Sequence, residues 1–316
     1  MARYENQDSR RRPHGMAAVF RWGVWERYVQ RRPIDAPGRP APRVEPDLDL
    51  LRRGAGPPRL TWIGHASFLA TLGGAHFLVD PVFSERVGWV VRRFGRPGLA
   101  TGQLPPLTAL LVTHNHYDHL DAPSIRALDR ALPVFVPRGL GRTLRRWGFR
   151  RVTELDWWAS ADAGPLTITL VPASHWSRRW IGDTNRSLWG GFVVEADGLA
   201  FYHCGDSSWF DGFAEIGRRF PNLLAAMLPI GAYAPAWFME HQHMNPEQAG
   251  RAFLRLGAKH LVPMHWGTFK LTDESLTAPV ERLRRWWSVN VDDRGRGLAV
   301  PAVGQTLVFE ERCRDC

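Results

Sequence analysis

Cysteine is scarce in this chain of 316 residues, which contains only three. Cys204 is expected to be a small buried residue. Cys313 and Cys316 form a single Cys-x-x-Cys pair, which is at most half of a zinc site. We therefore do not expect the disulfide framework that stabilises many small secreted proteins.

Long apolar runs are also missing, because none reaches the about 20 residues that a membrane-spanning helix needs. The first residues include arginines but no apolar signal core, so we expect a cytoplasmic protein. Hydrophobic residues make up 44% of the chain, which is enough to bury one large core, and the length permits one or two domains.

Lysine is rare, and arginine supplies most of the basic residues behind a formal net charge of +10. An arginine-rich composition alone can explain this excess. The alternative is attraction to anionic phosphate, either in lipid head groups or in nucleic acid. The basic residues are dispersed and no nucleic-acid-binding module is found, so we expect no specific nucleic-acid partner.

The most informative segment is residues 113–121, which hold three imidazoles and two carboxylates. The apolar residues 110–112 precede it, so the cluster is expected at the carboxyl end of a buried strand. Polar groups crowded in this way are costly to bury unless a cation satisfies them. The predicted metal ligands of this segment are His114, His116, Asp118 and His119.

Two metal ions fit this segment better than one. His114 and His116 lie on the same side of an extended chain, whereas Asp118 and His119 follow a turn and can face another point. Imidazole and carboxylate ligands without thiolate suit zinc, with manganese or iron as competitors. Further ligands must come from elsewhere. His175, Asp206 and His265 each follow a short apolar strand, which is how α/β folds assemble a site from distant segments.

Further motifs carry a family resemblance. They are Gly64-His65-Ala66-Ser67, Val79-Asp80-Pro81, His175-Trp176, Pro229-Ile230-Gly231, Gln242-His243 and His265-Trp266-Gly267-Thr268-Phe269. With the histidine cluster, they resemble the metallo-β-lactamase superfamily and, within it, the N-acylphosphatidylethanolamine-hydrolysing phospholipases D. The resemblance implies a four-layer αββα sandwich of two mixed sheets.

The resemblance also implies roles for individual residues. His114, His116 and His175 would hold one zinc ion, Asp118, His119 and His265 a second, and Asp206 would bridge the two. The expected catalytic residues are Asp118, which could also orient the attacking hydroxide, and Asp206. Tyr117 and His243 would contact the substrate head group. Asp80 is expected to hydrogen-bond a ligand imidazole, and His65 either supports the site in the same way or makes a structural turn.

The predicted function is therefore a dizinc phosphodiesterase of the phospholipase D type, which releases phosphatidic acid and an N-acylethanolamine. The alternative is a cytosolic lactonase or phosphodiesterase for a small soluble substrate. A third hypothesis, a basic membrane- or nucleic-acid-binding protein with a vestigial site, conflicts with the complete ligand set. Tryptophans near the ligand loops suggest an aromatic mouth for an acyl-bearing substrate, or else they pack the loops: Trp176, Trp180, Trp209 and Trp237.

We expect a phospholipid substrate and peripheral contact with the inner membrane surface, and the oligomeric state stays open, with a homodimer as one option. Residues 1–58 are predicted to form a basic, aromatic and Pro-rich extension, and residues 59–316 the metallo-β-lactamase-like catalytic domain. In the extension, an amphipathic helix is predicted around Phe20, Trp22, Trp25 and Tyr28, followed by an extended linker over 33–58.

Regular elements are predicted mainly beyond residue 58. Strands are expected at 59–63, 67–72 and 75–80, with a hairpin turn at Gly73-Gly74. Helices are expected at 122–132, 140–147, 211–219, 246–256 and 278–287.

Overall fold

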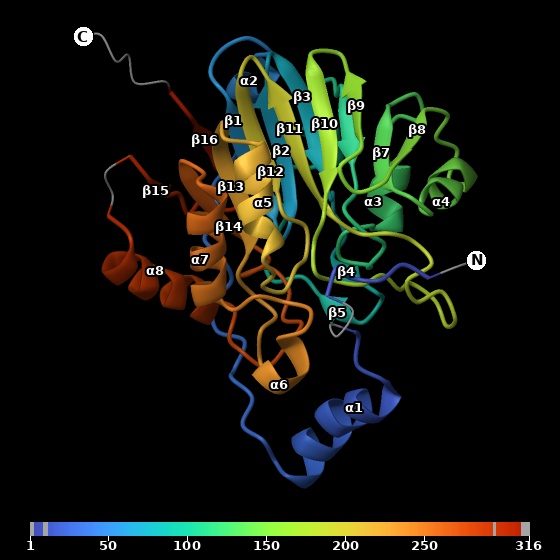
Figure 1. Cartoon of the computed structure of the whole chain (residues 1–316), viewed down its shortest axis with the longest axis vertical. Coiled ribbons are helices and arrows are strands. Elements are labelled where there is room, and N and C mark those ends of the chain that lie inside the picture. The colour runs from blue at the N-terminus through green and yellow to red at the C-terminus, as the bar shows by residue number, and fades with distance from the viewer. Residues whose placement is uncertain (1–2, 9–11, 293–294, 311–316) are drawn as a thin grey trace.

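Two stacked seven-stranded mixed sheets form the centre of the computed structural model, which describes residues 3–8, 12–292 and 295–310 (Figure 1). The strands of the first sheet are, in order, β16 (Thr306–Val308), β1 (Arg59–Gly64), β2 (Ser67–Leu72), β3 (Ala75–Val79), β6 (Ala109–Leu111), β7 (Val134–Pro137) and β8 (Val152–Leu155). Those of the second are β15 (Gly297–Leu298), β14 (His260–Met264), β13 (Leu223–Pro229), β12 (Leu199–His203), β11 (Gly191–Ala196), β10 (Leu166–Val171) and β9 (Ser160–Ala163). A separate hairpin pairs β4 (Arg86–Val87) with β5 (Val91–Arg92).

Helices cover the outer faces of both sheets. The helical elements are α1 (Met16–Phe20), η1 (Arg21–Val29), α2 (Leu48–Arg52), η2 (Thr101–Gln103), α3 (Ala122–Arg126), α4 (Gly141–Arg146), α5 (Gly212–Arg219), α6 (Ala236–Met239), α7 (Pro246–Leu256) and α8 (Ala278–Asn290). One apolar cluster packs α2, α3 and α4 against the first sheet, and another joins the two sheets with α5, α7 and α8. The predicted four-layer αββα sandwich is thus confirmed.

Alternation of side chains along the strands produces these layers. In β3, Phe77 packs between the two sheets, whereas its neighbour Leu78 belongs to the cluster under α2, α3 and α4. Both side chains are at most 1% exposed. Because successive side chains of a strand point to opposite faces, a strand covered on both faces is apolar throughout.

Strand direction explains how the fold can build a site. In the first sheet, β1, β3 and β6 run in the same direction, because β1 and β3 are both antiparallel to β2 and β6 is parallel to β3. In the second sheet, β10, β12 and β14 also share one direction. The carboxyl ends of the strands in each set therefore lie at a common edge of their sheet, where the loops that follow can meet.

Several predicted elements are confirmed closely. The Gly73-Gly74 turn joins β2 to β3, and both glycines have the positive φ values that a tight two-residue hairpin requires. α7 has the predicted bounds, with Asn245 capping its first turn and Gly257 ending it at φ 68°. The prediction for α3 was too long, because the Arg130 guanidinium binds the backbone carbonyls of Ile125, Arg126 and Leu128 and the chain turns there.

The segment before β1 runs along the sandwich, but the predicted extended linker over 33–58 is wrong at 48–52, where Asp47 caps the short helix α2. The Ala41 backbone N–H donates to the Gly267 carbonyl at 2.9 Å, and that of Val44 to the Val303 carbonyl at 2.9 Å. The predicted amphipathic helix is present as α1 and η1, which project at one end of the molecule near α6 (Figure 1). The domain boundary at residue 58 remains a prediction.

Two parts of the predicted features lie outside the described residues, namely Arg10 and Arg11 of the basic extension and the Cys313/Cys316 pair. Cys204 is buried, as predicted. None of the helices in the described part of the chain has both the length and the apolar character needed to span a bilayer.

Phe192 offers a test of the packing between the two sheets, because its side chain is fully buried in the cluster that joins them. Phe192→Ala should lower the free energy of unfolding by about 3–5 kcal/mol, since it removes apolar contacts and leaves a cavity. Urea denaturation would measure the loss. Val289→Ala, at a position that is 83% exposed on α8, is the control and should change stability by less than ~0.5 kcal/mol. Equal effects of the two substitutions would contradict the assigned core.

Candidate metal centre

All seven predicted metal ligands lie close together, where the carboxyl ends of strands from the two sheets meet. The first four follow β6, and the others follow β10, β12 and β14 in turn. With His65 and His243, their side chains form three overlapping groups of donor atoms, in each of which the atoms lie within 4.8 Å of one another. The first set is His114, His116, His175 and Asp206; the second is His65, Asp118, His119 and His265. The third group, Asp206, His243 and His265, shares one residue with each of these two sets.

The first set has the dimensions of a compact metal site. His116 Nδ1 lies 2.9 Å from His114 Nε2 and 3.1 Å from His175 Nε2. Asp206 Oδ2 lies 3.7 Å from His114 Nε2 and 3.8 Å from His175 Nε2. Tetrahedral zinc with bonds of about 2.0–2.1 Å would place its ligand atoms about 3.3 Å apart, so these residues fit the ion.

The second set surrounds the carboxylate of Asp118. Its Oδ2 lies 3.5 Å from His265 Nε2, 3.9 Å from His119 Nε2 and 2.9 Å from His65 Nε2. The Nε2 atoms of His119 and His265 are buried and make no hydrogen bond to any residue that the structure describes. Buried polar atoms without a hydrogen bond are rare, and a bound cation would satisfy both these ring nitrogens and the carboxylates beside them. The second set therefore also fits a metal ion.

Asp206 reaches both sets, as the bridging role implied by the resemblance requires. Besides its contacts in the first set, Oδ2 lies 3.1 Å from His119 Nε2, and Oδ1 lies 3.3 Å from His265 Nε2. Burial alone would raise the pKa of Asp206, but His119, His265 and His243 hold this pKa well below its usual range. The side chain is therefore an anion, which is the form that binds metal.

Histidine charge in the protein without metal depends on the nearby carboxylates. Burial lowers the pKa of His116 to about 4, so this imidazole is neutral at neutral pH. Burial also opposes charge on His265 and His119, but Asp206 and Asp118 outweigh it. The pKa of His265 rises to about 9, and that of His119 rises well above its ordinary value. Metal binding would displace these protons, because imidazole binds metal in its neutral form.

Asp80 orients the imidazole of His119 through a hydrogen bond. Its Oδ2 lies 2.7 Å from His119 Nδ1, so the predicted hydrogen bond to a ligand imidazole is present. The same carboxylate accepts the Thr113 backbone N–H at 2.8 Å and the Thr113 hydroxyl at 2.6 Å. Such a contact fixes which ring nitrogen faces the metal.

His65 is closer to the centre than a structural turn requires. Its ring contacts Asp118 directly, and burial together with nearby His265 lowers its pKa to about 3. His65 therefore supports Asp118 or serves as a further ligand of the second set. The sequence placed it at a strand end but carried no signal for its partner.

Three residues of the site have a backbone conformation that L-amino acids seldom adopt. The φ angles are +54° for His65, +43° for Asp80 and +62° for His265. Each residue follows a strand, so the left-handed turn redirects the chain at the edge of the sheet. Conformations of this kind carry a cost and occur preferentially at functional sites.

Sequence reasoning missed the support for the His175 imidazole. His175 Nδ1 lies 2.9 Å from the backbone carbonyl of Gln242, which leaves Nε2 to face His116. The Gln242 side chain accepts the indole N–H of Trp176 at 2.6 Å. The motif containing Gln242 was recognised, but a backbone carbonyl gives no signal in a sequence.

A cavity of about 990 Å³ opens beside the two ligand sets. His116, Asp118 and Asp206 reach its floor, and the predicted substrate-contacting residues Tyr117 and His243 line its wall. The remaining wall is largely apolar and includes Met16, Val87, Val90, Val91, Trp176, Trp180, Ile181, Met239 and Leu271. A cavity of this size is in the range of ligand-binding sites.

The prediction of an aromatic cavity mouth holds for two of the four tryptophans named for it. Trp176 and Trp180 line the cavity, but Trp209 and Trp237 are not among the described residues around it. Trp209 packs near Phe213 of α5, and Trp237 donates its indole N–H to Glu26 of η1 at 3.2 Å. These two tryptophans pack loops, which was the alternative reading of the sequence.

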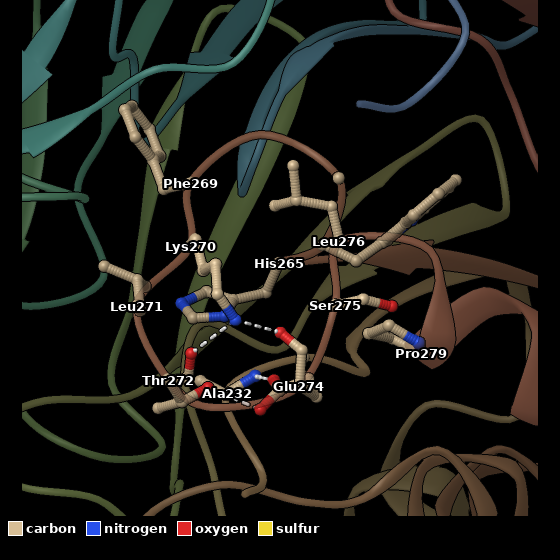
Figure 2. A pocket seen from close by; sticks show the side chains of 13 residues that line it. Ala232, His265, Phe269, Lys270, Leu271, Thr272, Glu274, Ser275, Leu276 and Pro279 are labelled. Carbon is tan, nitrogen blue, oxygen red and sulfur yellow. Dashed lines mark hydrogen bonds between the residues drawn. The ribbon is translucent and has the colours of Figure 1, made fainter. Parts of the chain in front are cut away.

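A much smaller pocket of about 10 Å³ lies behind His265 (Figure 2). Lys270 Nζ donates to the backbone carbonyls of residues 272–274 at 3.1, 3.0 and 2.8 Å, and the chain turns around it. The Glu274 carboxylate accepts the backbone N–H groups of residues 232–234 at 2.6, 3.3 and 3.2 Å. This network holds two loops together, and the pocket is too small for a substrate.

Comparison with known proteins gives a consistent result. The model of the beta-lactamase superfamily domain matches residues 75–266. An uncharacterized protein of Mycobacterium tuberculosis is 38% identical over 298 residues, which are 90% of this chain and 77% of the relative. An N-acyl-phosphatidylethanolamine-hydrolyzing phospholipase D 1 of Caenorhabditis elegans is 32% identical over 270 residues, which are 80% and 76% of the two chains.

Two further proteins extend the comparison. A metal-dependent hydrolase of Koribacter versatilis is 32% identical over 220 residues, which are 67% of this chain and 85% of the relative. The solved structure of a metallo hydrolase from Ignicoccus hospitalis matches with a TM-score of 0.64 at 24% identity, covering 81% of this chain and 100% of the other. The latter likeness supports the fold.

Asp206 tests whether the two ligand sets hold two ions. Protein purified without chelator should contain about two zinc ions per chain, because each set supplies enough donors for one. Asp206→Ala should lose more than one equivalent, since the carboxylate contacts both sets. Elemental analysis would measure the content, and one ion or fewer in the fully loaded parent protein would contradict a dinuclear site.

Proposed function

This chain belongs to the beta-lactamase superfamily, and we propose that it is a dizinc phosphodiesterase of the phospholipase D type. The family and the two His/Asp clusters identify a metal-dependent hydrolase. Within that class, the proposed substrate is N-acylphosphatidylethanolamine. Water would cleave the bond between phosphorus and the ethanolamine oxygen, and the products would be phosphatidic acid and an N-acylethanolamine.

The apolar cavity beside the ligand sets is the observation that carries this proposal. Its volume of about 990 Å³ exceeds what a small polar substrate needs, and its wall combines valines, methionines and tryptophans. Three of the predicted metal ligands, His116, Asp118 and Asp206, line it, so a phosphodiester could reach the metal site while acyl chains remain against apolar surface. The phospholipase D relative from Caenorhabditis elegans supports the same substrate class.

The proposed chemistry divides between metal and protein. When bound, two zinc ions would supply Lewis acidity and make water nucleophilic near neutral pH. The Asp118 side chain is 15% exposed and borders the cavity, so it can accept a hydrogen bond from the attacking water. Asp206 is 2% exposed and serves as an anionic anchor between the two sets.

His243 has the position of a group that contacts substrate. It lines the cavity, and its Nδ1 has no hydrogen-bond partner among the residues that the structure describes. Burial lowers its pKa to about 4, so the neutral ring offers one N–H donor at neutral pH. Tyr117 is constrained differently, because its hydroxyl donates to the Arg179 carbonyl at 2.7 Å and its ring forms part of the wall.

Exposed apolar side chains on two loops that border the cavity support contact with a membrane. At the tip of the β4–β5 hairpin, Trp89 is 77% and Val90 78% exposed. In the loop after His175, Trp180 is 60% exposed and Ile181 is completely exposed, and the Trp89 and Trp180 rings lie 6.5 Å apart. The exposed arginines Arg86, Arg92 and Arg178 flank these tips and would attract anionic lipid.

The helix formed by α1 and η1 has both a packed and an exposed face. Trp22 stacks on Phe238 at 4.8 Å and donates its indole N–H to Asp273 at 3.2 Å. Phe20 and Tyr28 are 58% and 68% exposed. The packed face of the segment therefore holds α6 against the domain. Its exposed face would add to the proposed membrane contact.

A lipid assay tests the proposed reaction. Purified, zinc-loaded protein should hydrolyse N-acylphosphatidylethanolamine and release N-acylethanolamine, detected by mass spectrometry. A panel of lactones and small soluble phosphodiesters provides the comparison. Turnover of the small compounds with no release from any phospholipid would contradict the proposal and favour the alternative hydrolase.

His243→Ala separates substrate contact from metal binding. The variant should retain the parent zinc content while turnover of the phospholipid falls by about 10²-fold, the lower range for removal of one hydrogen-bond donor to charge that develops in the reaction. Elemental analysis and the lipid assay would be run on the same preparation. Loss of zinc would instead identify His243 as a ligand, since it lies near Asp206 and His265.

Trp89→Glu tests the membrane-facing rim. Binding to anionic vesicles should weaken by about tenfold, because the substitution removes an apolar contact and adds repulsion on the order of 1 kcal/mol. Vesicle sedimentation at low salt would measure the change. Val289→Glu, at an exposed position on α8, is the matched control. Equal vesicle binding by the two variants would show that the rim does not contact lipid.

A further inference from the structure

The loop that carries His175 lies beyond the end of β10, so its backbone needs partners outside the sheet. On one side, the Ser174 N–H donates to the Ser207 hydroxyl at 3.0 Å, and the Ser174 carbonyl accepts from the Ser208 N–H at 2.8 Å. On the other side, Asn185 accepts the Ser177 N–H at 3.1 Å and donates its own N–H to the Ser177 carbonyl at 2.7 Å.

Between these two points, a single side chain serves both backbone groups of His175. The Asn6 Nδ2 donates to the His175 carbonyl at 2.8 Å, and the His175 N–H donates to Asn6 Oδ1 at 3.0 Å. The two residues are 169 positions apart. Nearby, the Tyr4 N–H donates to the Asn185 carbonyl at 2.8 Å, which fixes the segment 3–8 against the same loop.

Hydrogen bonds therefore fix both the backbone and the imidazole ring of His175. The residue is 1% exposed, so its backbone groups cannot rely on solvent. Its ring is oriented by the Gln242 carbonyl at Nδ1, and its Nε2 faces His116. Any movement of the His175 backbone would therefore move Nε2 away from the other donors of the first set.

We propose that Asn6 is a positioning residue for the first metal site, acting through the backbone of His175. The inference rests on the metal site of the proposed function and does not depend on the lipid substrate. An amide suits the role because it offers a donor and an acceptor in one plane. A carboxylate would keep the acceptor but would present its negative charge to the His175 carbonyl.

The test compares Asn6→Ala, Asn6→Asp and, as a matched control, Gln7→Ala, whose side chain is exposed in the same segment. Zinc affinity would be measured for the full chain by competition with a chelator, together with the melting temperature of the metal-free protein. Asn6→Ala should weaken binding of one zinc equivalent by 10- to 100-fold, the range typical when residues that support a metal ligand are removed. Asn6→Asp should also bind that equivalent more weakly, and Gln7→Ala should match the parent protein.

The absorption spectrum of the cobalt-loaded protein provides a second measurement, which a change in stability alone would not alter. In the cobalt-loaded protein, the absorption bands of the affected site should shift or weaken in Asn6→Ala and remain unchanged in Gln7→Ala. Parent-like zinc affinity in Asn6→Ala would overturn the proposal, whether or not the melting temperature falls. Equal weakening by Gln7→Ala would overturn it as well. A parent protein that binds no zinc would remove the metal site itself, which distinguishes that failure from a failure of Asn6.

Discussion

The buried carboxylate of Asp206 is the point on which both ligand sets depend. Its two oxygens lie within 3.1–3.8 Å of imidazole nitrogens from four histidines, and these histidines follow three different strands of two sheets. Burying so many polar groups together is costly unless opposite charges or metal ions compensate. The sandwich must therefore hold the edges of its two sheets in register, because a small displacement of either sheet would separate anions from imidazoles.

The rigidity needed for this arrangement comes from groups that do not bind metal. Asp80 holds His119 and Thr113, and Glu274 holds the backbone of residues 232–234 next to the loop of His265. Gly231 allows these loops to approach, since a Cβ there would lie 2.0 Å from the His265 carbonyl oxygen. The strained φ angles at three site residues are tolerated because the surrounding sheets and hydrogen bonds hold the backbone in this conformation.

The cavity shows how one fold can combine a polar reaction centre with an apolar substrate. Three of the predicted ligands, His116, Asp118 and Asp206, line it, while the hairpin β4–β5, the loop after His175 and Met16 of α1 contribute to its wall. None of these three segments belongs to the sandwich itself. Loops and short hairpins can vary in length and polarity without disturbing the sheets, so substrate choice in this fold can change while the metal site is retained.

Local sequence indicated the candidate ligands and most strand positions near them, and the family resemblance of its motifs implied the class of fold. His114, His116, Asp118 and His119 stand within one short segment after an apolar strand, and this pattern is legible without a structure. Only the tertiary structure decided that Asn6 and Gln242 support His175, that His65 contacts Asp118, and that Trp209 and Trp237 pack elsewhere. Each of these facts depends on contacts between segments far apart in the chain, and such contacts follow from sheet register and loop packing rather than from local pattern.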